Sequence, residues 1–135
     1  MQRFWKLGFA AQLSLVVIIS IGAYAGVVPT VFTVIPGLDK LGHFILIGGL
    51  AFFLDGALDH REALRGLRVP RLAPVLVLTV AGVEEYLQRL SPRRTSEWGD
   101  FFADAVGVFF FAWLAGRVGR HLEERDREVV PAVEP

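Results

Sequence analysis

The sequence contains no cysteine and has a formal net charge of zero, because 14 lysines and arginines balance 14 aspartates and glutamates. The absence of cysteine excludes disulfides, thiolate metal sites and cysteine nucleophiles. The absence of net charge removes any global electrostatic argument for nucleic acid as a partner. No nucleophile elbow, phosphate-binding glycine loop or dinucleotide fingerprint is present, and neither an H-x-x-x-H nor a D-x-D metal-ligand spacing occurs. The sequence therefore predicts no cofactor and no metal.

Apolar residues, by contrast, are abundant for a chain of this length. They make up 53% of the 135 residues, phenylalanine alone occurs 11 times, and the mean hydropathy is +0.49. A soluble protein of this size has to cover most of its surface with polar groups, which this composition does not favour. The composition indicates an integral membrane protein.

Four apolar runs predict four transmembrane helices. The run at 7–28 has no charged residue, and at about 1.5 Å per residue it crosses the roughly 30 Å hydrocarbon layer of a bilayer. The runs at about 41–58, 72–90 and 101–116 contain ionisable residues, so each by itself is also compatible with a buried soluble helix or a re-entrant segment. Their regular spacing favours an all-α bundle, with a transmembrane domain at 1–118 and a charged cytoplasmic tail at 119–135.

The distribution of basic residues predicts the orientation. With the N-terminus inside, the inner segments contain Arg3, Lys6, Arg61, Arg65, Arg68, Arg71, Arg117, Arg120, Arg125 and Arg127. The outer segments contain only Lys40, Arg89, Arg93 and Arg94. The positive-inside rule therefore places both termini in the cytoplasm. Residues 1–25 also resemble a cleavable secretory signal, although their apolar core is long for one.

Polar residues occupy the outer ends of the three later runs. Asp39 and His43, like Asp100 and Asp104, are four residues apart and share one helix face. Neighbouring glutamates at 84 and 85 diverge by about 100° around their helix, so the sequence does not decide which one faces inward. A charge at this depth costs about 2.5 to 3.5 kcal/mol, so these groups should face the bundle interior and find partners there.

These residues also form a recognisable pattern. Asp39-Lys40-x-x-His43-Phe44, followed by Glu85-x-x-Gln88, Arg94-x-x-Glu97-x-x-Asp100-x-x-x-Asp104 and Gly107, resembles the VanZ-like family of small multi-spanning bacterial membrane proteins over about residues 36–116. The resemblance favours Glu85 over Glu84, and this chain departs from it at Asp104, where the family often has asparagine. The predicted polar cluster is therefore Asp39, Lys40, His43, Glu85, Gln88, Arg94, Glu97, Asp100 and Asp104.

The resemblance implies a location in the bacterial cytoplasmic membrane and a role in the cell envelope. The family takes its name from a protein associated with low-level tolerance of the glycopeptide teicoplanin, and the resemblance supplies no biochemical activity. Membrane lipids are the expected partners.

The residues leave several interpretations of the cluster open. It is either a structural ion-pair network, a site for an anionic lipid or glycan head group built on Arg94, or the centre of an enzyme that acts on a lipid-linked envelope substrate. A fourth interpretation is an accessory subunit of a larger membrane complex. Head-group binding is the functional prediction that we adopt. Outside the cluster, Asp55 is expected to pair with the inner loop, and His60 to be solvated.

Overall fold

The computed structural model describes residues 2–27, 35–60, 71–90 and 98–129. Within these ranges the chain forms four α-helices: α1 (Gln2–Ala25), α3 (Leu38–Ala57), α4 (Leu72–Gln88) and α5 (Trp98–Val129). The prediction of an all-α chain is confirmed for the described residues. Each predicted apolar run overlaps one of these helices, and the runs at 7–28, 41–58 and 72–90 continue past the helix ends at Ala25, Ala57 and Gln88.

The helices α1, α3 and α5 extend beyond their apolar runs into flanking polar residues. The helix α1 begins at Gln2 and so includes Arg3 and Lys6, whose long side chains reach polar surroundings from a helix end. Upstream of α3 stands Gly37, with φ of 80°, a left-handed conformation that glycine adopts without strain. The helix α5 continues unbroken past residue 118 to Val129, so the predicted domain boundary falls within a helix.

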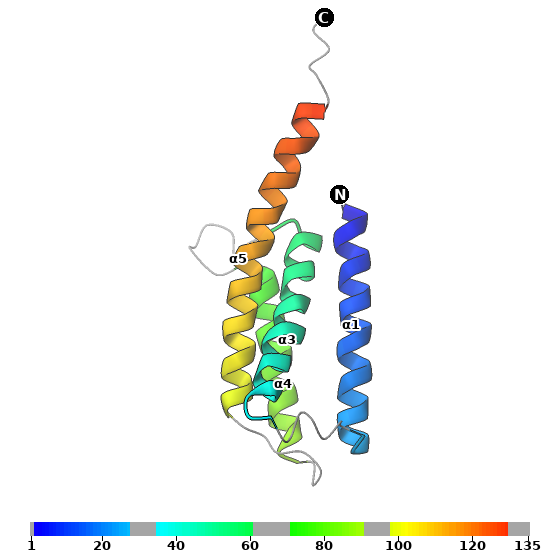
Figure 1. Cartoon of the computed structure of the whole chain (residues 1–135), viewed down its shortest axis with the longest axis vertical. Coiled ribbons are helices and arrows are strands. Elements are labelled where there is room, and N and C mark those ends of the chain that lie inside the picture. The colour runs from blue at the N-terminus through cyan, green and yellow to red at the C-terminus, as the bar shows by residue number, and fades with distance from the viewer. Residues whose placement is uncertain (1, 28–34, 61–70, 91–97, 130–135) are drawn as a thin grey trace, which may run out of the picture.

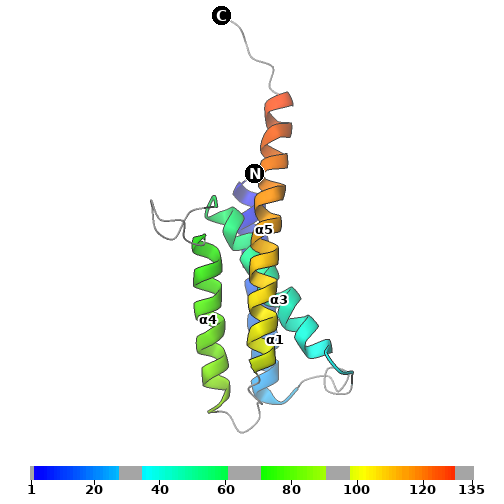
Figure 2. The same ribbon diagram turned by 90° about the vertical axis from the view of Figure 1, so that its left-hand side faces the viewer.

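The four helices alternate in direction (Figure 1). The N-terminus and the C-terminal end of α5 lie at one end of the bundle, where α3 ends and α4 begins. The opposite end holds the starts of α3 and α5 and the ends of α1 and α4. Figure 2 shows α3 inclined to α4 and α5, with α4 and α5 running side by side. We call the end that holds the starts of α3 and α5 the polar end, and the other the terminal end.

Three of the helices are long and apolar enough to cross a membrane, within Gln2–Ala25, Leu38–Ala57 and Trp98–Arg125. The fourth, α4, has 17 residues and is about 25 Å long. Large apolar side chains on α1 point outward; Leu7, Ile18 and Ile21 are each more than 60% exposed. An outward apolar surface of this kind suits lipid and not water, in agreement with a membrane protein.

Helix α5 packs most closely on α3, while α1 lies against α3 and α4 lies against both α3 and α5. Leu50, Ala51, Val77 and Val108 form a buried apolar cluster between the helices. Between α3 and α5 the contact depends on glycines, because a Cβ on Gly107 would collide with the backbone carbonyl of Phe44, and one on Gly48 would lie 2.9 Å from the Gly107 backbone. Small residues let membrane helices approach in this way.

Candidate functional site: a polar cluster and a pocket at the polar end

The structure brings polar side chains of three helices together at the polar end. Those of α3 come from its first two turns, those of α4 from its last two, and those of α5 from its first two. The described residues of this polar cluster are Asp39, Lys40, His43, Glu84, Glu85, Gln88, Asp100 and Asp104. Two further predicted members, Arg94 and Glu97, lie outside the described residues.

One half of the cluster joins α3 to α5 through ion pairs. Lys40 Nζ lies 3.2 Å from Asp39 Oδ2 and 3.4 Å from Asp100 Oδ1. The His43 ring lies between two carboxylates, with Nδ1 3.0 Å from Asp104 Oδ1 and Nε2 4.0 Å from Asp100 Oδ2. Asp100 and Asp104 are both more than 90% buried. This half pairs charges internally, as a structural network does.

The two neighbouring glutamates of α4 face different neighbours. Glu84 is half-buried and accepts hydrogen bonds from Ser20 Oγ of α1, at 3.3 Å, and from Gln88 Nε2, one turn further on. Glu85 is 5% exposed and lines a cavity between α4 and α5. Glu84 therefore contacts α1, whereas Glu85 faces the cavity beside α5. In the sequence, the four-residue spacing of Glu84 and Gln88 puts both side chains on one helix face, and this was the signal that could have placed Glu84 in the cluster.

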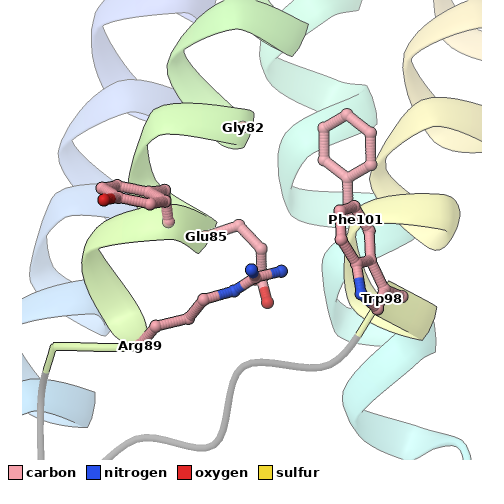
Figure 3. A pocket seen from close by; sticks show the side chains of 6 residues that line it. Gly82, Glu85, Arg89, Trp98 and Phe101 are labelled. Carbon is pink, nitrogen blue, oxygen red and sulfur yellow. The ribbon is translucent and has the colours of Figure 1, made fainter.

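The cavity has a volume of about 190 Å³ and opens between the end of α4 and the start of α5 (Figure 3). Its six lining residues are Gly82, Glu85, Tyr86, Arg89, Trp98 and Phe101. The guanidinium of Arg89 lies over the indole of Trp98, with Cζ 4.8 Å from the ring centroid. In Figure 3 the side chains of Arg89 and Glu85 both extend from α4 toward the side of the cavity where Trp98 and Phe101 stand.

Of these lining residues, sequence reasoning placed only Glu85 in the site. Arg89 follows Glu85 by four residues, a spacing that puts both on one helix face. A tryptophan next to an apolar run, as Trp98 is, is typical of the membrane–water interface and does not by itself indicate a site. Only the packing of α5 against α4 shows that its ring forms a wall of the cavity.

Metal binding has no support in the described geometry. Among the residues that the structure describes, no three histidine, aspartate or glutamate side chains are placed to hold an ion together.

A second charged cluster lies at the terminal end, and sequence reasoning anticipated only part of it. Asp55 is fully buried, and its Oδ2 lies 2.7 Å from His60 Nδ1 and 2.7 Å from Arg71 Nη1. Arg71 also donates to the carbonyl oxygen of Ala112 in α5, at 3.0 Å. The expectation that His60 is simply solvated is wrong, because its ring contacts Asp55 and packs edge-on against Trp5.

The backbone after α3 explains why His60 turns back. The His60 N–H donates to the Asp55 carbonyl at 2.9 Å, and the Asp59 N–H donates to the Gly56 carbonyl at 3.2 Å. This is the hydrogen-bond pattern of a Schellman motif, with Asp59 and His60 both in the left-handed region at φ of 56° and 55°. The motif returns His60 to the carboxylate it bonds.

Comparison of the chain with models of known protein families, with curated proteins and with solved structures finds no match. The functional interpretation therefore rests on the residues of the site and their geometry.

Proposed function

We propose that the protein is a VanZ-like protein of the bacterial cytoplasmic membrane, with four membrane-crossing helices, both termini in the cytoplasm and the polar cluster at the outer surface. The described basic residues support this orientation. The terminal end holds Arg3, Lys6, Arg71, Arg117 and Arg120, whereas the polar end holds Lys40 and Arg89. This asymmetry is the one that the positive-inside rule associates with a cytoplasmic terminal end.

Cysteine labelling tests this orientation without removing any native thiol, because the chain has none. Leu90 follows α4 at the polar end and is 71% exposed, and Glu123 is exposed near the end of α5. We expect a membrane-impermeant maleimide to label Leu90→Cys in intact cells, and to label Glu123→Cys only after the cells are opened. The reverse pattern would refute the orientation.

At the molecular level, we propose that the protein binds the phosphate-bearing head group of a membrane lipid in the α4–α5 cavity. The observation that supports this most directly is the Arg89 guanidinium, held over Trp98 at the cavity. A guanidinium recognises phosphate through two parallel hydrogen bonds. Stacking on the indole restrains the side chain, which reduces the entropy lost when a ligand binds.

The size of the cavity narrows the class of ligand. Pockets for drug-sized molecules have volumes of about 300 to 1,000 Å³, and this cavity has about 190 Å³. A single small head group fits that space better than a glycan chain or a glycopeptide. The acyl chains of such a lipid would lie along the outward apolar surfaces of α4 and α5, where Val83 and Phe102 are more than 50% exposed.

An envelope role follows from this binding activity, as the VanZ-like resemblance implies. A lipid-binding protein with its cavity at the outer surface would act by holding or presenting a lipid of the outer leaflet. The α3–α5 half of the polar cluster then has a supporting role, because its ion pairs fix α5, one of the two helices that flank the cavity, to α3.

Replacing Arg89 tests head-group binding. We expect Arg89→Gln to lower photo-cross-linking of a phospholipid with a photoreactive head group, at peptides covering 82–101, by about tenfold. This is the loss expected from a charge-assisted hydrogen bond of about 1.5 kcal/mol.

The chain offers a matched control at its other end. Arg117 lies over Trp113 with Cζ 4.9 Å from the ring centroid, a similar distance to that of the Arg89 stack, and it is not among the residues that line the α4–α5 cavity. Arg117→Gln should leave cross-linking at 82–101 unchanged. Equal losses in the two variants, or no loss in Arg89→Gln, would contradict the proposed site.

A further inference from the structure

The charged side chains around the α4–α5 cavity affect which phospholipid head group the cavity can bind. Among the residues that the structure describes, the polar cluster and the cavity together hold five carboxylates: Asp39, Glu84, Glu85, Asp100 and Asp104. The cations at the same end of the described chain are Lys40 and Arg89, with His43 able to add a third. Among these described residues, carboxylates therefore outnumber the permanent cations.

The charges at this end divide between the α3–α5 side and the cavity. Lys40 contacts Asp39 and Asp100, so its charge is used on the α3–α5 side. Glu85 is buried against the cavity at 5% exposure. A head group that carries only negative charge would meet repulsion from this carboxylate at short range, in surroundings that screen charge weakly.

Glu85 and Arg89 present opposite charges to one cavity. They stand one helical turn apart on α4, and both line the cavity. Side chains four residues apart on a helix have Cβ atoms about 5 to 6 Å apart. Two opposite charges on neighbouring turns can therefore meet the two opposite charges of one zwitterionic head group. Each of the two side chains has a partner within the protein, and a carboxylate with about four lone-pair sites accepts an ammonium in addition to existing donors.

We propose that the cavity selects a zwitterionic aminophospholipid head group, with the phosphate at Arg89 and the primary ammonium at Glu85. This inference rests on the proposed function. A primary ammonium donates three hydrogen bonds to acceptors such as the Glu85 carboxylate, whereas a trimethylammonium donates none. The rings of Tyr86, Trp98 and Phe101 supply π faces that attract a cation within the same walls. The α4 and α5 walls are close together at Gly82, where an added Cβ would lie 3.4 Å from the Phe101 ring.

Competition cross-linking of the full-length protein in detergent tests the selection. The photoreactive lipid is a phosphatidylethanolamine analogue, and the competitors are unlabelled phosphatidylethanolamine, phosphatidylglycerol and phosphatidylcholine. We expect phosphatidylethanolamine to compete about tenfold better than either of the others, since the others lack the ammonium donor that a buried carboxylate favours. Soluble phosphoethanolamine should compete far more weakly, because it lacks the acyl chains; equal potency would show that the ligand is the free compound and would overturn the lipid assignment.

Glu85→Gln separates charge recognition from simple binding. The change conserves size, and its thermal unfolding midpoint verifies that the protein is folded. We expect cross-linking to persist while the preference for phosphatidylethanolamine over phosphatidylglycerol falls to about twofold or less. Glu84→Gln is the matched control, since Glu84 faces Ser20 and Gln88, and it should retain the preference.

The failures of the two proposals are distinguishable. Phosphatidylglycerol competing as well as phosphatidylethanolamine in the unmodified protein, or full preference in Glu85→Gln, overturns the selection and leaves head-group binding standing. Cross-linking at 82–101 that does not depend on Arg89 overturns head-group binding itself.

Discussion

Asp55→Ala is expected to lower the free energy of unfolding by about 3 kcal/mol. The Asp55 carboxylate is fully buried and accepts from both His60 and Arg71. Removing one partner of a buried ion pair costs about 3 to 5 kcal/mol, because the other charge is left uncompensated. The lower end of that range applies here, because the Arg71 side chain is 33% exposed and solvent can partly compensate its charge. Unfolding in mixed detergent–SDS micelles measures the loss.

A double substitution identifies the cause of that loss. Asp55→Leu combined with Arg71→Met removes both charges and fills the site with apolar atoms, so it should recover much of the stability lost in Asp55→Leu alone. A double variant as unstable as the single one would show that packing, and not the unpaired guanidinium, sets the cost. Glu124→Ala, at an exposed position of α5, should change the unfolding free energy by less than about 0.5 kcal/mol.

Gly107→Ala is expected to destabilise the bundle by about 3 kcal/mol. An added Cβ collides with the Phe44 carbonyl oxygen and lies 3.0 Å from the Phe44 Cα. Because these are backbone atoms, no side-chain rotation relieves the collision, and α3 has to move away from α5. Overpacking of a well-packed core costs about 1 to 3 kcal/mol, and this rigid contact belongs at the upper end. The same micelle titration measures it.

Gly22→Ala supplies the comparison on another membrane helix. Its nearest neighbour outside the local helix is the Val27 carbonyl oxygen at 3.8 Å, an ordinary contact. Alanine also has the higher helix propensity, by about 1 kcal/mol in a soluble helix. We expect Gly22→Ala to be neutral or stabilising. If both glycine substitutions had the same effect, close approach of α3 and α5 would not be what Gly107 provides.

The tight contact of α3 with α5 separates the two charged ends of the protein. His43 and Asp55 lie near the start and the end of α3, about 18 Å apart along the helix. Between them α3 meets α5 through a layer of small and apolar residues, all of them buried: Gly48, Ala51, Gly107 and Val108. A change at one end should therefore leave the other intact, which makes the stability and lipid-binding experiments independent readouts.

The sequence by itself determined the helical class and the gathering of polar groups at one end. In an apolar run long enough to span a bilayer, an α-helix pairs every backbone N–H and C=O group within the segment itself. Once the helices alternate in direction, the starts of two of them and the end of a third share a depth. For this reason, residue spacing and helix direction alone are enough to predict that Asp39, His43, Asp100 and Asp104 lie near one another.

Only the tertiary structure decided which side chains meet. Rotation of each helix about its axis sends Glu84 toward Ser20 and Glu85 toward the cavity, and local sequence does not fix that rotation. The cavity exists because Trp98 and Phe101 of α5 pack beside α4. Likewise, Asp55 meets His60 through the left-handed turn after α3, and Arg71 through the return of the chain into α4. Spacing rules describe neighbours on one helix, whereas these contacts depend on how separate helices are oriented and packed.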